Sequence, residues 1–377
     1  IGVISYSLYL WHWPIIVFSG HLPINLPANA KIPFVLISSV ALAFISFEYI
    51  ERPFRGASSP FSRKQIFALG FAVSIATVSF GFAAYLSHGL PERYDPQTRQ
   101  IVAINLQRMK DWDREPESCT NWRTEVHSLA DIHFCGVGSQ SPQKIMFWGD
   151  SHVGQFFPLI EALYADGELQ GRGVVMANAS GCLPDEQLNN AAEGYHCDAF
   201  SKFALQRAEK EDIDTVFIGF SAWTTLRDHF ACVASGGRCV MMLSRDEFRQ
   251  HFLADLSDEI RTLRHFGKNV IVSLPFPIYD KRIPELEISN AVFGRFGLLE
   301  TTGDYTSPQF REEVKAIATN AGAEIFDPRL SLCRGQDCLY QVGGISIYMD
   351  DNHIAGSQVG ILRSNLKAVL QRAMKTR

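Results

Sequence analysis

The stretch Ile145-Met146-Phe147-Trp148-Gly149-Asp150-Ser151-His152 joins an apolar run to a small polar turn. A short apolar run that ends in glycine and polar residues is typical of a buried strand followed by a turn. A helical pattern then continues from Val153 to Ala165. The sequence therefore predicts a strand, a turn and a helix, with Ser151 exposed at the turn.

Short β-branched runs alternate with longer helical patterns from residue 144 onward. Strands that alternate with helices predict an α/β fold, a parallel sheet flanked by helices. Ligands bind such sheets beyond the carboxyl ends of the strands, where the turn Gly149–His152 is expected. The expected strands are Lys144–Trp148, Gly173–Asn178, Thr215–Phe220, Asn269–Leu274 and Glu324–Phe326, and the expected helices are Val153–Ala165, Asp198–Lys210, Arg245–Phe266, Ser307–Asn320 and Gly356–Met374.

An acid-histidine pair, Asp350-Asp351-Asn352-His353, lies near the end of the chain. A serine hydroxyl is a poor nucleophile near neutral pH, so it needs an imidazole to take its proton and a third group to orient that ring. We therefore predict Ser151 as nucleophile, His353 as base and Asp350 as the orienting acid. His152 is an alternative base and Asp351 an alternative acid, whereas Asp150 is expected to cap the following helix.

A tetrahedral intermediate also needs hydrogen-bond donors for its oxyanion. The backbone N–H of Ser151, at a helix start, is one candidate. Gly181 is another, because a residue without Cβ lets the backbone approach a ligand. The alternative interpretation of Gly181 is an ordinary turn glycine.

Three apolar stretches occupy the first quarter of the chain: Val3–Ser19, Ile32–Ile50 and Ile66–Leu86. Each is close to the roughly 20 residues that cross a bilayer, so we expect three transmembrane helices. The chain does not begin with Met, which suggests the end of a longer polytopic protein. A cleaved signal peptide is an alternative, but it fits poorly with two further spans.

The loops between these stretches differ in charge. Only Lys31 lies between the first two, whereas four cationic residues lie between the second and third: Arg52, Arg55, Arg63 and Lys64. Cationic loops near spans stay in the cytoplasm. The residues after about position 87 are therefore expected on the far side of the membrane, the periplasm of a Gram-negative bacterium.

All eight cysteines lie in this exported part. An even number in an oxidising compartment favours disulfides, and the tightest expected pairs are Cys232 with Cys239 and Cys333 with Cys338. Zinc binding is the alternative, although the sequence has no CxxC pair. The net charge of −5 gives no basic surface for nucleic acid.

Gly149-Asp150-Ser151-His152, with Asp350 and His353, resembles the first and last blocks of SGNH-type (GDSL-like) esterase and acetyltransferase domains. The resemblance covers about residues 144–370. That family usually has an asparagine after a central strand, whereas this chain has Gly219-Phe220-Ser221-Ala222-Trp223 there. A tryptophan near this point is similar to SGNH domains attached to membrane acyltransferases, which implies that Trp223 contacts oxyanion or substrate.

The N-terminal part resembles the acyltransferase 3 family. Ser5-Tyr6-Ser7-Leu8-Tyr9-Leu10-Trp11-His12-Trp13-Pro14 is similar to a late transmembrane segment of that family, and Glu51-Arg52-Pro53-Phe54-Arg55 to its terminal signature. An aromatic belt and a basic stop-transfer loop would also account for these residue types. The family's early histidine and arginine motifs are absent from this sequence.

The two resemblances imply a domain order: 1–86, C-terminal helices of an acyltransferase 3 unit; 87–143, a periplasmic linker; and 144–377, an SGNH-like catalytic domain. They imply a multi-pass inner-membrane O-acyltransferase, an O-acetyltransferase acting on lipopolysaccharide O-antigen or a related envelope glycan. Acetyl-CoA would be the ultimate cytoplasmic donor, without a bound cofactor or metal. The expected partners are the glycan acceptor, membrane lipid and the missing acyltransferase 3 region, and not nucleic acid. The alternatives are a carbohydrate esterase with the same triad and a non-catalytic glycan-binding module.

Overall fold

The computed structural model describes residues 2–21, 28–54, 61–87, 89–111, 134–192, 195–221, 231–235, 238–294 and 299–375. The chain divides into two compact units, which we describe separately. The first consists of residues 1–102 and 288–301, and the second of residues 103–287 and 302–377.

The first unit is helical: α1 (Ser5–His21), α2 (Ala28–Ser46) and α3 (Arg63–Leu86). Two segments, Asn29–Phe54 and Arg63–Leu86, are long and apolar enough to cross a membrane, each with a mean hydropathy of 2.0. Helix α1 has only 17 residues and contains Pro14, so the first predicted span, Val3–Ser19, stays a prediction. The apolar side chains of α3 are exposed, which distinguishes it from the buried core helix of a soluble domain.

Short elements follow these helices. A π-helix (Phe47–Glu51) and a 3-10 turn (Arg52–Phe54) extend α2, and a second 3-10 turn (Pro91–Arg93) follows α3. Helix α4 (Pro96–Arg108) lies within the predicted linker, where helical turns are expected around Gln97–Asp113.

The second unit contains a six-stranded sheet in the order β1-β3-β2-β5-β8-β9. All neighbouring strands are parallel except β1, which pairs antiparallel with β3. The α/β fold with a mainly parallel sheet is therefore confirmed, with an unpredicted antiparallel edge. The strands are β1 (Cys135–Val137), β2 (Lys144–Gly149), β3 (Gly173–Asn178), β5 (Ile213–Gly219), β8 (Asn269–Ser273) and β9 (Glu324–Phe326).

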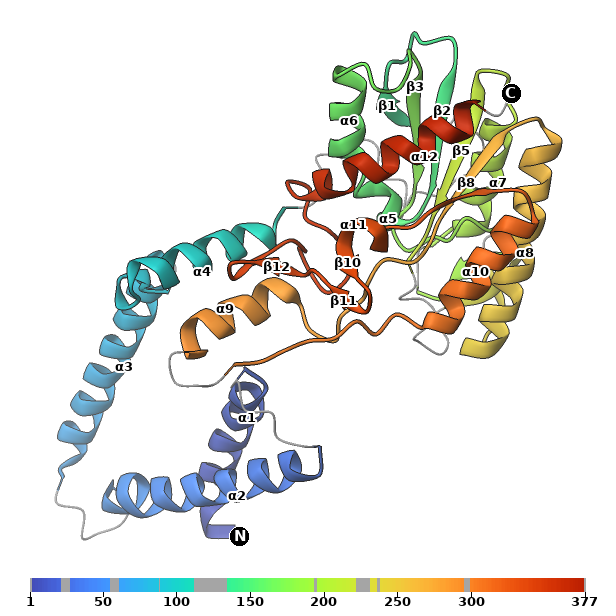
Figure 1. The fold of residues 1–377 in the computed structure, drawn as a ribbon. Coiled ribbons are helices and arrows are strands. Elements are labelled where there is room, and N and C mark those ends of the chain that lie inside the picture. The colour runs from blue at the N-terminus through green and yellow to red at the C-terminus, as the bar shows by residue number, and fades with distance from the viewer. Residues whose placement is uncertain are drawn as a thin grey trace. The chain divides into compact units, whose positions relative to one another are not determined.

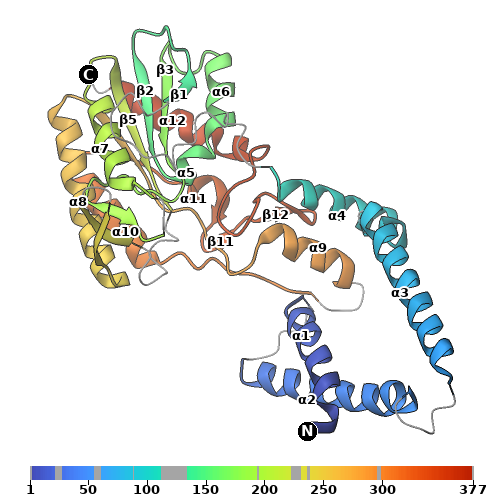
Figure 2. The ribbon, with the colours of Figure 1, turned by 180° about the vertical axis from the view of Figure 1, so that it is seen from behind.

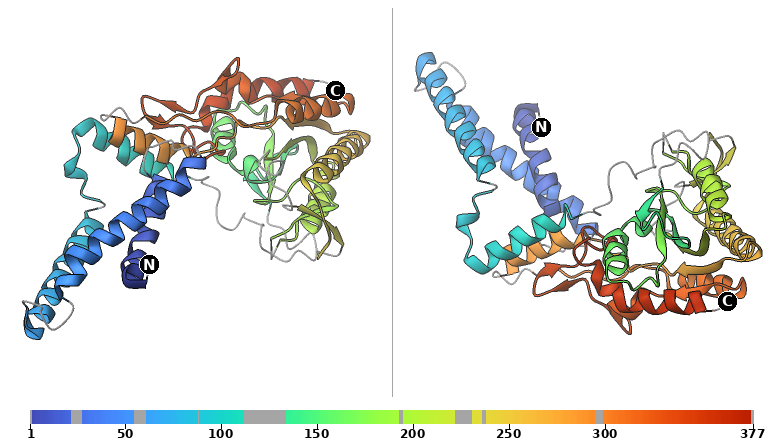
Figure 3. Two further views of the ribbon diagram at one scale, coloured as in Figure 1. Left: turned by 90° about the horizontal axis from the view of Figure 1, so that it is seen from below. Right: turned by 90° about the horizontal axis from the view of Figure 1, so that it is seen from above.

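Helices cover both faces of this sheet (Figures 1 and 2). One face packs against α7 (Cys197–Ala208), α8 (Arg245–His265) and α10 (Pro308–Asn320). The other packs against α6 (Phe157–Ala165) and α12 (Arg363–Lys375). Figure 3 shows the strands between α8 and α12.

Alternate residues of the central strand β2 enter opposite cores. Met146 and Trp148 belong to the core under α8, whereas Ile145 and Phe147 belong to the core under α12. All four side chains have no exposed surface. A parallel strand buried on both faces needs such a continuous apolar run. Strand β2 could therefore be predicted from the sequence.

Smaller elements surround the sheet. The predicted helix Val153–Ala165 is two helices, α5 (Ser151–Gly154) and α6, because the chain turns at Gln155 and Phe156 and restarts with Pro158 in the first turn of α6. A second sheet consists of β4 (Leu188–Asn190), β6 (Ala231–Ser235) and β7 (Arg238–Met242). Two hairpins pair β10 (Cys333–Arg334) with β11 (Asp337–Cys338) and β12 (Gln341–Val342) with β13 (Ile345–Ser346), and α11 (Arg329–Leu332) and the 3-10 turn Val359–Leu362 are short helices. Helix α9 (Ile283–Phe293) crosses the boundary between the two units in sequence.

Disulfides link these smaller elements. The predicted pairs Cys232–Cys239 and Cys333–Cys338 are confirmed. A third bond, Cys182–Cys197, ties the loop after β3 to the start of α7. Cys135 is also disulfide-bonded, and Cys119 lies outside the described residues. The bonded thiols are therefore not available as zinc ligands.

Gly149, at the end of β2, is packed against the neighbouring strand β5. Its register partner on that strand is Gly219. Its backbone has a φ of +156°, and a Cβ added there would lie 1.7 Å from the Gly219 carbonyl oxygen. Backbone on a central strand cannot move away from such a clash, so glycine is required at this position.

We predict that Gly149→Ala lowers the free energy of unfolding by roughly 4 kcal/mol or more, because the clash is with buried backbone. Thermal unfolding of the full chain in detergent, followed by circular dichroism, measures this. Gly303→Ala is the matched control, since an added Cβ there meets nothing within 4 Å. Equal unfolding midpoints for the two variants would contradict the prediction.

Candidate active site

The turn after β2 is held by Asp150, whose side chain is 2% exposed. Its Oδ1 accepts a hydrogen bond from the His152 N–H at 2.8 Å, and its Oδ2 accepts one from the Ser221 N–H at 2.8 Å. The expected capping role of Asp150 is therefore confirmed. Through Ser221, the same carboxylate also ties the turn to the loop that follows β5.

Three of the predicted site residues meet at the carboxyl edge of the sheet. Ser151 Oγ lies 2.8 Å from His353 Nε2, and His353 Nδ1 lies 2.8 Å from Asp350 Oδ2. A carboxylate only accepts, so Nδ1 carries the ring proton and the neutral Nε2 accepts from the serine hydroxyl. This is the arrangement in which imidazole can remove a proton from serine.

The carboxyl of Asp350 is held in its ionised form. Burial raises its pKa, but hydrogen bonds from the His353 ring and from the backbone N–H groups of Asn352 and His353 outweigh burial and lower it to about 2. The two backbone bonds to Oδ1 are 2.9 and 2.7 Å long. Asp350 is thus a fixed negative charge beside Nδ1, and it can stabilise a positive imidazole ring.

The alternative residues take other contacts. His152 Nε2 lies 3.0 Å from Asn352 Oδ1, and its side chain is 1% exposed, so it is bonded away from the serine. Asp351 Oδ1 accepts from the Asn352 side chain at 2.7 Å. Among the described contacts, the ring of His353 therefore pairs with Asp350 and not with Asp351.

The loop that carries Asp350 and His353 is anchored from two directions. The N–H groups of Tyr279 and Ile283, after β8, donate to the carbonyl oxygens of Asp351 and Asp350 at 2.8 and 3.1 Å. From the nucleophile side, Gln155 Oε1 accepts from the Ile354 N–H at 2.9 Å. Gln155 was not predicted, and its only sequence signal is its place one helical turn after Ser151.

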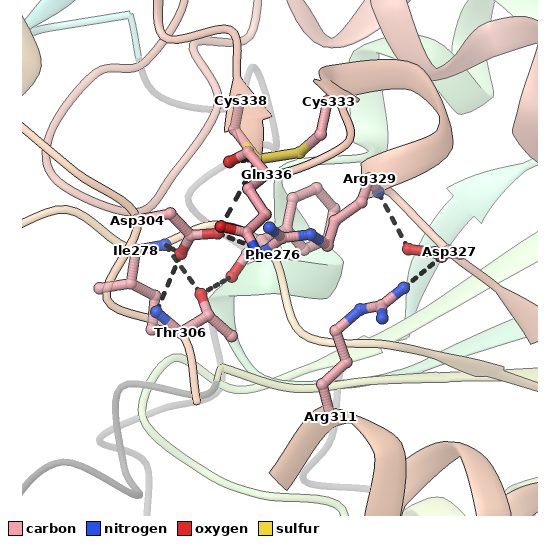
Figure 4. The surroundings of a disulfide bond; sticks show 10 residues. All are labelled: Phe276, Ile278, Asp304, Thr306, Arg311, Asp327, Arg329, Cys333, Gln336 and Cys338. Carbon is pink, nitrogen blue, oxygen red and sulfur yellow. Dashed lines mark hydrogen bonds and ion pairs between the residues drawn. A yellow bond between two sulfur atoms is a disulfide. The ribbon is translucent and has the colours of Figure 1, made fainter. Parts of the chain in front are cut away.

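Figure 4 shows how the loop after β8 is itself held. The Ile278 N–H donates to Thr306 Oγ1 at 3.1 Å and to Asp304 Oδ1 at 3.3 Å, while the Thr306 hydroxyl donates to the Phe276 carbonyl at 3.0 Å. Asp304 is in turn paired with Arg329, next to the Cys333–Cys338 hairpin. The sequence gives no sign of this support.

Gly181 lies in the loop after β3 with a φ of +78°. Its carbonyl accepts from Asn190 Nδ2 at 3.2 Å, which fixes the peptide orientation. Ser151 is the first residue of α5, and the first N–H groups of a helix have no partner within the helix. Trp223, the other predicted substrate contact, lies outside the described residues.

Among the described residues, no group of three or more His, Cys, Asp or Glu side chains could hold a metal ion.

Residues 118–364 match a family model described as an SGNH domain (fused to AT3 domains). O-acetyltransferase OatA of Staphylococcus aureus strain MRSA252 is 26% identical over 218 residues, covering 52% of this chain and 36% of that protein. The same protein from strain NCTC 8325 gives the same values. The match thus spans only about a third of the length of these relatives.

Two solved structures are also similar. The periplasmic domain of a lipopolysaccharide acetyltransferase from Salmonella ser. Paratyphi A has a TM-score of 0.45 and 13% identity, covering 60% of this chain and 82% of that chain. A catalytic mutant of an acetylxylan esterase from Geobacillus stearothermophilus has a TM-score of 0.33 and 16% identity, covering 61% and 94%. Since the family model covers well over half of the sequence, the chain belongs to the family of SGNH domains fused to AT3 domains.

Proposed function

We propose that this protein is a membrane-bound O-acetyltransferase. It would move an acetyl group through Ser151 onto a hydroxyl of lipopolysaccharide O-antigen or a related envelope glycan. The observation that carries the proposal is the continuous chain of two 2.8 Å hydrogen bonds from Ser151 Oγ through His353 to Asp350. The relationship to OatA supports acetyl as the transferred group.

The proposed reaction has two halves. In the first, Ser151 Oγ attacks the carbonyl carbon of the acetyl donor while His353 Nε2 takes the hydroxyl proton. The intermediate collapses to an acetyl-serine ester, and His353 returns the proton to the leaving group. In the second, His353 removes a proton from a sugar hydroxyl, whose oxygen attacks the ester carbonyl; the bond to Ser151 Oγ then breaks, and His353 returns the proton to that oxygen to regenerate the free serine.

Donors near the turn would stabilise the negative oxygen of each intermediate. We assign this role to the N–H groups of Ser151 and Gly181, each worth on the order of 3 kcal/mol in such sites. Trp223 would contact the sugar, since aromatic side chains provide a large apolar contact surface. No bound cofactor takes part in this scheme, and acetyl-CoA would supply the acetyl group from the cytoplasmic side.

The proposed location is the bacterial inner membrane, with the SGNH domain in the periplasm. Support comes from the two long apolar helices, from the cationic residues between them, and from the disulfides of the second unit. Residues 1–86 would belong to an acyltransferase 3 unit, and the upstream part of such a unit would be the partner that delivers the acetyl group.

We predict that Ser151→Ala abolishes both labelling by a fluorophosphonate probe and acetylation of envelope glycan. The reason is that the hydroxyl that would form the acetyl-serine ester is lost. Mass spectrometry of glycan from cells that carry each variant measures the second effect. Ser364→Ala, an exposed serine on α12, is the matched control. Retained acetylation in a folded Ser151→Ala protein would rule out the proposal.

An esterase would share the same serine chemistry, so transfer needs a separate measurement. The full chain in detergent is incubated with an activated acetyl ester and an oligosaccharide acceptor, and acetylated sugar is compared with free acetate. A transferase yields acetylated sugar that increases with acceptor concentration. Acetate alone would identify a carbohydrate esterase, and an unlabelled but folded protein would indicate a glycan-binding module.

We predict that Asp350→Asn slows the serine reaction by about 10³- to 10⁴-fold, since an amide cannot stabilise the positive ring. The reaction rate of Asp351→Asn should fall far less, because the Asp351 carboxylate does not contact the His353 ring. The probe-labelling rate of each variant at fixed pH measures this. Similar losses in both would contradict the assignment of Asp350.

The same carboxylate predicts a pH effect on stability. Its pKa falls from 3.8 to about 2 on folding, so the ionised form stabilises the fold above pH 3.8. This contribution is lost as the pH falls from 3.8 toward 2. The unfolding midpoint of wild type should therefore decrease more steeply in this window than that of Asp350→Asn, as measured by thermal unfolding.

A further inference from the structure

Two imidazole rings lie against each other in the site. The ring centroids of His152 and His353 are 4.6 Å apart, with an interplanar angle of 41°. Phe276 contacts His152 as well, at 5.5 Å between centroids. The reaction scheme above uses only His353, so the buried second ring requires its own explanation.

Hydrogen bonds fix the tautomer of His152. The carboxylate of Asp351 accepts from the Asn352 side chain at 2.7 Å, so the amide nitrogen of Asn352 must face Asp351. Its oxygen then faces His152 Nε2, 3.0 Å away, and that nitrogen must carry the proton. The remaining nitrogen, Nδ1, is buried and has no hydrogen-bond partner within the described part of the chain.

The ring of His152 is also held uncharged. Burial lowers its pKa to about 3, and the neighbouring His353 acts in the same direction, while Asn352 and Asp350 oppose the shift. Two further carboxyls are near: Asp150, on the same turn, has a pKa raised to about 6, mainly by burial, and Asp351, bonded to the same Asn352 side chain, has its pKa raised by burial. A neutral ring therefore lies beside the ring that must become positive during the reaction.

We propose that His152 is a positioning residue for His353. The inference rests on the proposed function, since it assigns His353 as the base. The Asn352 tether keeps the His152 ring in one orientation, and this flat ring limits rotation of His353 about its bonds to Ser151 and Asp350. Hydrogen bonding to Asn352 alone does not require an imidazole, because the side-chain amide of a glutamine could donate the same bond.

The test uses the full chain in detergent and the rate at which a fluorophosphonate probe labels Ser151 between pH 4 and 9. His152→Gln keeps a donor for Asn352 but removes the ring, whereas His152→Phe keeps a flat ring but removes the donor. His265→Gln, an exposed histidine at the end of α8, is the control. Rates are corrected for the folded fraction of each variant.

On the high-pH plateau of the labelling rate, both His152 variants should label on the order of 10- to 100-fold more slowly than wild type. The reason is that His353 is no longer held within reach of the Ser151 hydroxyl. The two should differ in pH dependence. With glutamine, water reaches His353 and favours its charged form, so the midpoint should rise by about one pH unit. With phenylalanine at position 152, water stays excluded from the His353 ring. The pH at which the labelling rate is half of its plateau should therefore stay close to that of wild type.

A second measurement does not depend on catalysis. The ring proton between His353 Nδ1 and Asp350 should give a far-downfield proton NMR signal in wild type, and this signal should broaden or vanish in His152→Gln and persist in His265→Gln. A wild-type protein that shows this signal but does not label would contradict the proposed function and not the positioning role. Unchanged signal in His152→Gln, or a labelling rate within about twofold of wild type, would overturn the positioning role.

Discussion

The close approach of β2 and β5 at Gly149 and Gly219 is the constraint on which the rest of the site depends. With no room for a Cβ between these two backbones, the chain can leave β2 in a turn that brings the Asp150 carboxylate to the backbone of Ser221. That bond sets where α5 begins, and the start of α5 sets where the Ser151 hydroxyl points. The position of Ser151, the proposed nucleophile, is therefore decided by backbone packing at Gly149.

His353, the proposed base, reaches Ser151 from a loop 202 residues away in sequence, so its position must be fixed by contacts rather than by the chain. On one side the backbone N–H groups of Tyr279 and Ile283 donate to this loop, and on the other the Ile354 N–H of the loop donates to the Gln155 side chain. Backbone groups have little freedom once their strand or loop is fixed, which makes them suitable supports for an orienting acid. The Asp304–Arg329 pair extends the support to the disulfide hairpin at Cys333.

The central strands of the six-stranded sheet could be predicted from the sequence because they are buried on both faces, whereas the short strands outside it could not. Strands β2 and β3 are continuous apolar runs because both faces are buried, and such runs are visible without a structure. Strand β7 is exposed along its whole length, so its composition carries no burial pattern. The meeting of Ser151 with His353 followed from spacing and chemistry, whereas Gln155 and Asn352 act only through a three-dimensional arrangement that no local pattern encodes.

Asp150 and Asp350 are both carboxylates removed from water, yet their pKa values move in opposite directions, to about 6 and about 2. Burial is the first cause in both cases, and both receive two backbone N–H groups. Two differences separate them. Asp350 is less deeply buried, with 19% of its side chain exposed against 2% for Asp150, and it accepts a hydrogen bond directly from His353, whereas Asp150 experiences that ring only through the longer-range Coulomb interaction. A carboxylate whose charge is stabilised by the ring must stabilise a charge on the ring in return, because the coupling is reciprocal. Of these two acids, only Asp350 is therefore placed to stabilise the positive charge that His353 would carry in the proposed reaction, and Asp150 contributes by holding the turn.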